Sequence, residues 1–119
     1  LGRSGSGKSG LVLQLMAFGA ELVADDRTRL LRREDIVMAM SPETIHGRVE
    51  ARGVGILAAV AAEAVPLALV TDLDRMEKAR LPEPRSHDVL GVALPLLFRV
   101  DAPHFPAALL QWLKAGRIA

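Results

Sequence analysis

The chain has 119 residues, of which half are hydrophobic but only 3% aromatic, and its 15 basic and 14 acidic side chains leave a formal net charge of +1. So small a net charge argues against attachment to nucleic acid or to a membrane through charge alone, and the scarcity of aromatic rings excludes a stacking platform for single-stranded nucleic acid. The length suits one domain, residues 1–119, and the absence of cysteine suits the cytoplasm.

The first segment of the chain fits the pattern G-x-x-x-x-G-K-[ST] of a phosphate-binding loop. Its glycines let several backbone N–H groups point at an anion, Lys8 adds a mobile positive charge, and Ser9 offers a hydroxyl to magnesium. Because a strand should precede such a loop, we expect the domain to be N-terminally truncated. A Gly/Ser-rich linker is the alternative. The candidate nucleotide-binding residues are Gly2, Arg3, Ser4, Gly5, Ser6, Gly7, Lys8 and Ser9.

A helix and a strand are predicted directly after the loop. Residues 9–18 are apolar at close to a 3.6-residue period up to Gly19, and residues 21–24, Glu-Leu-Val-Ala, predict a short buried strand that delivers Asp25 and Asp26 at its carboxyl end. A right-handed crossover would bring both aspartates beside the phosphates. One could hold magnesium through water and the other could accept a proton during phosphoryl transfer. Alternatively, one caps the following turn and the other is solvated.

The middle of the chain predicts a hairpin and a sharp bend. Residues 27–33 and 36–40 are two strand-like runs that favour a hairpin at a sheet edge, and residues 41–43, Ser-Pro-Glu, indicate a turn or a helix start. Further on, Gly53 and Gly55 stand two residues apart, which indicates a sharply bent backbone close to a bulky neighbour.

The last third predicts strands at residues 65–73 and 90–100, a mobile charged loop at 72–88 and a closing helix at 106–114. Together with the first half, this order indicates an α/β fold with a mixed sheet flanked by helices. The sequence shows no signature of an enclosed apolar pocket. We therefore expect the phosphoryl acceptor to be a folded protein that docks on the loop and the closing helix.

Two charged residues flank the Gly-x-Gly bend. Glu50 could complete a metal shell, and Arg52 could hold the phosphate of a second substrate. The alternative is that they form a mutual surface pair of opposite charges or are solvated, which contributes little.

Three segments in this order resemble one family: the phosphate loop, Glu-Leu-Val-Ala-Asp-Asp at 21–26, and Val-Glu-Ala-Arg-Gly-Val-Gly-Ile at 49–56. The chain resembles, over about residues 2–70, the catalytic domain of HPr kinase/phosphorylase, a bacterial enzyme that acts on a seryl residue of the phosphocarrier protein HPr. The resemblance implies a phosphate-loop (P-loop) kinase-like domain, an ATP-dependent serine kinase with magnesium as cofactor, HPr as partner, a cytoplasmic location and a homo-oligomer, by resemblance a hexamer.

The resemblance also implies roles for single residues. Lys8 matches the phosphate-binding lysine, Ser9 and Glu50 match magnesium ligands, and Asp26 matches the proton acceptor of phosphorylation and donor of the reverse reaction. Asp25 is implied as a supporting residue and Arg52 as a basic residue of the signature. The chain has Gly10 where the family commonly has glutamate, and it lacks an Arg-Pro-Gly-Arg element. We therefore expect kinase activity, and these departures count against phosphorolysis. The rivals are a small-metabolite kinase and a non-enzymatic nucleotide sensor.

Overall fold

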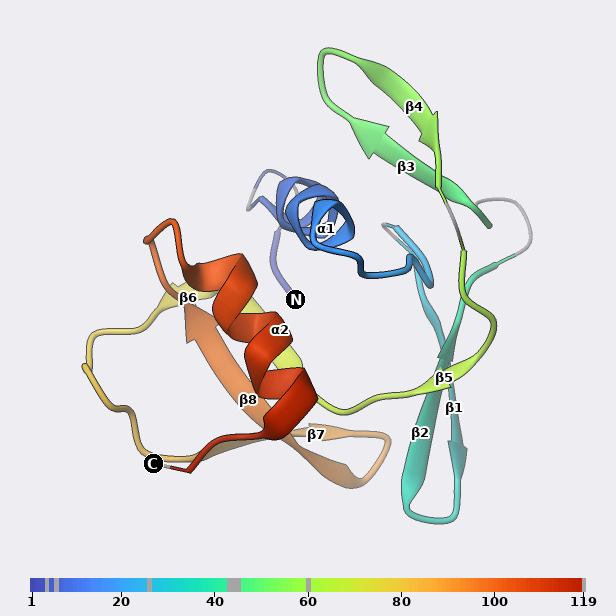
Figure 1. Ribbon diagram of the computed structural model, residues 1–119. Helices are drawn as coiled ribbons and strands as arrows, with labels where there is room; N and C mark the ends of the chain where they lie inside the picture. The colour runs from blue at the N-terminus through green and yellow to red at the C-terminus, as the bar shows by residue number, and fades with distance from the viewer. Residues whose placement is uncertain (4, 6, 26, 43–45, 60, 119) are drawn as a thin grey trace. The chain divides into compact units, whose positions relative to one another are not determined.

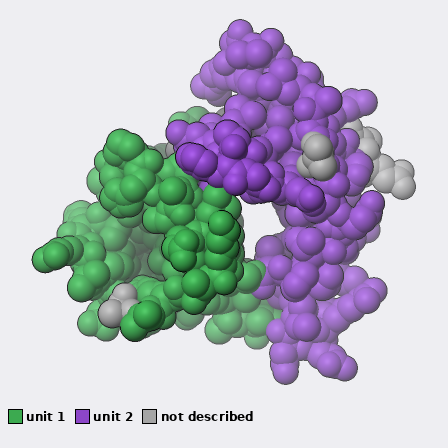
Figure 2. Space-filling model, viewed as in Figure 1, with its two compact units in different colours: residues 1–8, 68–119 green, residues 9–67 purple. Residues whose placement is uncertain are grey.

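The computed structural model describes residues 1–3, 5, 7–25, 27–42, 46–59 and 61–118. These residues form two compact units, one of residues 1–8 and 68–119 and the other of residues 9–67 (Figure 2). Each unit buries its own apolar side chains. The expected organisation as one domain stays a prediction. The core of unit 9–67 consists of Leu22, Val37, Ala39, Val49 and Ala51, and that of the other unit of Val70, Leu73, Leu94, Phe105 and Leu109.

Helix α1 (Lys8–Ala17) follows the phosphate loop directly, which confirms the predicted helix. It ends in a Schellman motif, in which the Gly19 N–H donates to the Met16 carbonyl (3.0 Å) and the Ala20 N–H donates to the Leu15 carbonyl (3.0 Å). Gly19 has a φ of 102°, which only glycine adopts without strain. The helix therefore stops at the glycine that the sequence indicated.

Antiparallel strands make up most of unit 9–67. One sheet contains β1 (Arg29–Arg33), β2 (Ile36–Met40) and β5 (Val65–Pro66), in the order β1-β2-β5. A second sheet contains β3 (Arg48–Ala51) paired with β4 (Gly55–Ala58). The predicted hairpin over residues 27–40 is confirmed. The strand predicted at 21–24 is reduced to a single parallel bridge between Leu22 and Ala61. Of the predicted turn or helix start at 41–43, residue 43 lies outside the described residues.

The bend at Gly53 and Gly55 is confirmed, but the expected bulky neighbour is wrong. Gly53 (φ 82°) and Gly55 (φ 141°) lie at the exposed end of the β3–β4 hairpin. A β-carbon at either position would meet no atom of the described residues within 4 Å. Both glycines are therefore explained by the backbone angles of the hairpin and not by a close approach.

The unit of residues 1–8 and 68–119 contains a mixed sheet and a helix (Figure 1). Its strands are β6 (Val70–Met76), β7 (Arg85–Val89) and β8 (Val92–Arg99), with β8 in the centre, parallel to β6 and antiparallel to β7. Helix α2 (Phe105–Ala115) buries Phe105 and Leu109. The predicted strand at 90–100 and the predicted helix at 106–114 are both confirmed.

Two expectations for residues 65–88 are wrong. The predicted strand at 65–73 is divided between β5 and β6, which belong to different sheets. The charged segment 72–88 is not one mobile loop, because β6 continues to Met76 and β7 begins at Arg85. A strand with one solvated face carries charges on alternate residues, and so a high density of charge does not exclude strands. Only residues 77–84 lie outside them.

Pro95 lies inside the central strand without breaking it. Proline has no backbone N–H and is normally confined to positions where no ladder hydrogen bond is needed. Pro95 is opposite Ser86 of β7, whereas pairing with β6 begins one residue later, at Leu96. The missing N–H therefore costs no hydrogen bond to β6.

Glu77 and Arg85 hold together the two ends of the segment 77–84. Their side chains form an ion pair, and the Arg85 guanidinium lies 4.3 Å from the centre of the Phe98 ring. This hydrogen-bonded guanidinium holds the pKa of the Glu77 carboxyl below its ordinary value of 4.5. A carboxyl with a lowered pKa in the folded state stabilises the fold above its unfolded pKa, and this contribution is lost as the pH falls through the folded pKa.

We therefore expect Glu77→Gln to lower the thermal unfolding midpoint at neutral pH and to match wild type when the pH falls well below 4.5. Thermal unfolding followed by circular dichroism from about pH 7 to about pH 3 measures this difference. Glu83→Gln, at an exposed glutamate of the same segment, is the matched control and should follow wild type throughout. A midpoint difference for Glu77→Gln that is independent of pH would contradict the expectation.

Candidate active site

The phosphate loop begins beside strand β6. The backbone N of Leu1 donates to the Thr71 carbonyl (2.6 Å), and the Leu73 N–H donates to the Leu1 carbonyl (2.8 Å). This is the alternating pattern of parallel strands, in which one residue bonds to two residues of its neighbour. The chain therefore enters the loop from the sheet and runs in the direction of β6.

Within the loop, Gly5 (φ 85°) and Gly7 (φ 98°) have left-handed backbone angles, as expected of a chain that turns its N–H groups toward an anion. The Lys8 ammonium donates to the Gly2 carbonyl, so that its side chain folds back to the start of the loop. An ammonium has three N–H donors, and two remain for other acceptors. Ser4 and Ser6 lie outside the described residues.

Arg3 is attached to β6 by a contact that the sequence did not indicate. Its backbone N–H donates to both carboxylate oxygens of Asp74, at 2.9 and 3.2 Å, and its guanidinium Nε lies 3.6 Å from Asp74 Oδ1. The sequence had placed Asp74 in a mobile loop and gave it no role. No motif contains this residue, and only the pairing of the loop with β6 brings it to Arg3.

In unit 9–67, Asp25 connects the first turn of α1 with strand β3. Its Oδ1 accepts a hydrogen bond from the Ser9 hydroxyl (2.9 Å), and its Oδ2 accepts one from the Glu50 backbone N–H (2.9 Å). Both side-chain oxygens of Asp25 are thus engaged by residues that the sequence singled out. The turn that follows uses the Asp25 carbonyl instead, which accepts from the Arg27 N–H. The alternative that Asp25 caps this turn with its side chain is wrong.

The other predicted site residues lie as follows. Asp26 lies outside the described residues. The Glu50 side chain is exposed on β3, and Arg52 is exposed in the turn between β3 and β4. These two side chains form no ion pair with each other among the salt bridges of the described residues. The structure therefore brings Ser9, Asp25 and the Glu50 backbone together. The exposed Glu50 and Arg52 side chains agree with the solvated form of the expected surface alternative and not with a mutual ion pair.

In the Ser9–Asp25–Glu50 cluster, the Ser9 hydroxyl and the Asp25 carboxylate meet, and Glu50 joins them through its backbone N–H. Hydroxyl and carboxylate oxygens are the usual protein ligands of magnesium, which keeps several waters, so that one or two side chains are enough. Among the described residues, no three His, Cys, Asp or Glu side chains gather in a group that could hold a metal by themselves. The residues present thus fit magnesium that is shared with a phosphate better than a metal in an all-protein cage.

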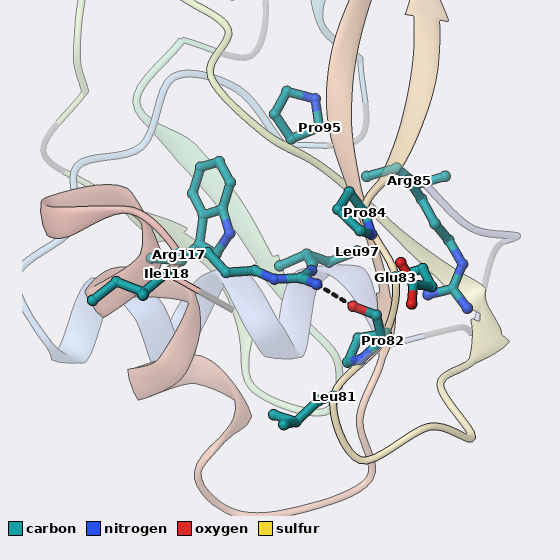
Figure 3. A pocket seen from close by; sticks show the side chains of 11 residues that line it. Leu81, Pro82, Glu83, Pro84, Arg85, Pro95, Leu97, Arg117 and Ile118 are labelled. Carbon is teal, nitrogen blue, oxygen red and sulfur yellow. Dashed lines mark hydrogen bonds between the residues drawn. The ribbon is translucent and has the colours of Figure 1, made fainter.

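A cavity of about 580 Å³ lies in the unit of residues 1–8 and 68–119 (Figure 3). Its lining includes Leu81 and Pro84, Leu97 of β8 and Trp112 of α2, and the Arg117 guanidinium donates to the Pro82 carbonyl beside it. This cavity is partly open to solvent, so it does not contradict the expectation that the chain has no enclosed apolar pocket. Residues 81–84 and α2 form it together, and no single segment indicates it. Of the predicted site residues that the structure describes in this unit, none lines the cavity.

The fold and the site define an α/β protein with a phosphate-loop motif and a serine–aspartate contact directly after it. Neither α1 nor α2 has the length and apolar content needed to cross a bilayer. The family model described as HPr Serine kinase C-terminal domain matches residues 1–79. The chain belongs to this family, and the predicted resemblance is confirmed.

Curated relatives and a solved structure agree with this membership. The chain is 37% identical to an HPr kinase/phosphorylase of Verminephrobacter eiseniae, and the match covers 92% of the chain and 39% of the relative. It is 34% identical to an HPr kinase/phosphorylase of Chloroherpeton thalassium, and this match covers 88% of the chain and 34% of the relative. It spans about two fifths or less of the length of these relatives. The structure of the Hpr(Ser) kinase/phosphatase from Coxiella burnetii has a similar fold, with a TM-score of 0.77, 20% identity, and 95% of this chain and 82% of that chain covered.

Proposed function

We propose that this chain is the catalytic part of an enzyme that transfers the γ-phosphoryl group of ATP to a seryl residue of HPr. The relatives named HPr kinase/phosphorylase support this assignment. The observation that carries it is the hydrogen bond between the Ser9 hydroxyl and Asp25, because it places a carboxylate against the last residue of the phosphate loop. We also propose a P-loop kinase-like fold, a cytoplasmic location and a homo-hexameric assembly.

Each residue has a distinct task in this reaction. Lys8 and the N–H groups of the loop bind the phosphates, and the N-terminal end of α1 adds its positive partial charge. Ser9, Asp25 and Glu50 hold magnesium, which when bound offsets the charge that develops on the transferred group. Arg52, on the exposed turn of the hairpin, is suited to hold the phosphate of a second substrate that carries one, such as phosphoseryl HPr in the reverse direction.

Asp26 acts as the base. It accepts the proton of the serine hydroxyl while the serine oxygen bonds to the γ-phosphorus, the bond from that phosphorus to the bridging oxygen breaks, and ADP leaves. In phosphorolysis, inorganic phosphate would bond to the phosphorus of phosphoserine while the bond from that phosphorus to the serine oxygen breaks. The same carboxyl would then return a proton to the serine oxygen, and pyrophosphate would leave.

The metal requirement tests the Ser9–Asp25–Glu50 cluster. Ser9→Ala and Glu50→Gln should each raise the magnesium concentration needed for half-maximal transfer by about tenfold, since each removes one oxygen from the metal's surroundings. Titration of magnesium at a fixed ATP concentration measures it. Glu63→Gln, at another exposed glutamate of the same unit, should leave the requirement unchanged. An unaltered requirement in both site variants would remove the cluster from metal binding.

Label transfer from ATP carrying ³²P in its γ-phosphate tests the function against its rivals. The full-length protein is incubated with labelled ATP and magnesium, either with HPr or with a protein-free metabolite extract. Label that becomes acid-precipitable with HPr supports the proposal. Label that moves only into small molecules supports a metabolite kinase, and bound but untransferred label supports a nucleotide sensor.

A further inference from the structure

We propose that Asp74 is a positioning residue that fixes the entry of the phosphate loop by accepting the Arg3 backbone N–H. The inference rests on the proposed function in one respect, because it takes the loop to bind nucleotide phosphates. It adds a residue outside every motif of the sequence. Both residues belong to the same compact unit.

The contact replaces a hydrogen bond of the sheet. Leu1 pairs with Thr71 and Leu73, so a continued parallel ladder would direct the Arg3 N–H to the Leu73 carbonyl. That carbonyl instead accepts from Arg99 Nη1 at 3.3 Å, and the pairing of β6 with β8 shifts register between Asp72 and Met76. The Asp74 carboxylate therefore supplies the acceptor where the chain leaves the sheet to form the loop.

Asp74 is itself held in place. Its backbone N–H donates to Asp72 Oδ1 (2.9 Å), and Asp72 Oδ2 lies 3.6 Å from Arg75 Nε. The Asp74 side chain is 33% exposed, whereas that of Arg3 is 88% exposed. The backbone hydrogen bond, rather than the solvated ion pair, is therefore the contact that restrains the loop.

The proposed restraint predicts the direction in which the affinity for ATP changes when Asp74 is removed. Gly5 and Gly7 give the backbone of the loop conformational freedom. When the loop samples several conformations, its apparent affinity for ATP falls in proportion to the fraction of molecules in the binding-competent conformation. Losing Asp74 should thus weaken ATP binding. If Asp74 were merely a negative charge near the phosphates, its removal would strengthen binding instead, because like charges repel. The direction of the change separates the two roles.

The test is a calorimetric titration of magnesium-ATP into the full-length protein and its variants. Asp74→Ala should raise the Kd about tenfold, the effect of losing one hydrogen bond to a charged group. Asp74→Asn should stay within about threefold of wild type, because the amide oxygen still accepts the Arg3 N–H. Asp88→Ala is the matched control, since Asp88 Oδ1 accepts the Gly91 N–H (2.8 Å) at the β7–β8 turn, and its Kd should not change.

The outcomes separate this inference from the proposed function. An unchanged or lower Kd in Asp74→Ala, with ATP binding lost in Lys8→Ala, overturns the positioning role alone. Wild-type binding in Lys8→Ala overturns the phosphate site itself. If Asp74→Ala lowers the unfolding midpoint more than Asp88→Ala does, the Kd of Asp74→Glu distinguishes the positioning role from a general loss of stability. It keeps the charge but displaces the oxygens, so a Kd raised severalfold supports the inference and an unchanged Kd refutes it.

Discussion

Replacing Lys8 with alanine should abolish ATP binding, with a loss of affinity of at least about a hundredfold. The Lys8 ammonium already reaches back to the Gly2 carbonyl and so lies at the loop, where it can neutralise part of the triphosphate charge. Backbone dipoles alone leave that charge uncompensated, both in the bound nucleotide and in the transition state. Calorimetry with ATP in the presence of magnesium gives the affinity directly.

The control for Lys8 is a lysine of the same compact unit. Lys114→Ala removes an exposed lysine from the last turn of α2 and changes the net charge by the same amount. It should bind ATP as wild type does. Wild-type affinity in Lys8→Ala itself would mean that the segment 2–9 is not a phosphate site, and the linker interpretation of that segment would then hold.

Asp26→Asn should reduce the rate of phosphoryl transfer by about 10² to 10⁴ while the affinity for ATP changes by less than about twofold. A base that accepts the serine proton acts only as the serine oxygen attacks, so removing it costs transition-state stabilisation and not nucleotide binding. Single-turnover transfer to HPr gives the rate, and calorimetry gives the affinity.

The neighbouring aspartate provides the comparison. Asp25 accepts hydrogen bonds from the Ser9 hydroxyl and the Glu50 N–H, so Asp25→Asn should raise the magnesium requirement together with any loss of rate. The two substituted aspartates are adjacent in the sequence. Asp26→Asn should change the transfer rate, whereas Asp25→Asn should also change the magnesium requirement. Unimpaired transfer in Asp26→Asn would remove Asp26 from the mechanism.

The sequence predicted the helices and strands that are specified by residues close together in the chain, because the apolar period and the end signal of each lie in one short segment. Helix α1 has both an apolar period and Gly19 at its end, and the β1–β2 hairpin, β8 and α2 are likewise local. The sequence also placed Asp25 beside the phosphate loop, and its side chain contacts Ser9, although the strand predicted to deliver it is a single bridge between Leu22 and Ala61. The predicted elements were found because each depends on the pattern of one segment.

Non-local contacts limited the remaining predictions. The charge of residues 72–88 predicts a loop for the second half of β6 and for all of β7, and only pairing with β8 makes them strands. The contact of Asp74 with Arg3 depends on the register of the loop's entry against β6, and the cavity beside Trp112 depends on how α2 meets residues 81–84. Neither the register nor this packing is encoded in a local pattern.

The most direct test of the account is the position of the phosphate on its acceptor. The full-length protein is incubated with ATP, magnesium and HPr from the same organism, and the phosphate is located by mass spectrometry, with Asp26→Asn run in parallel. The account predicts one phosphate on a serine of HPr, at a yield strongly reduced in the variant. Unmodified HPr in the presence of bound ATP, or phosphate found only on a small metabolite, would contradict it.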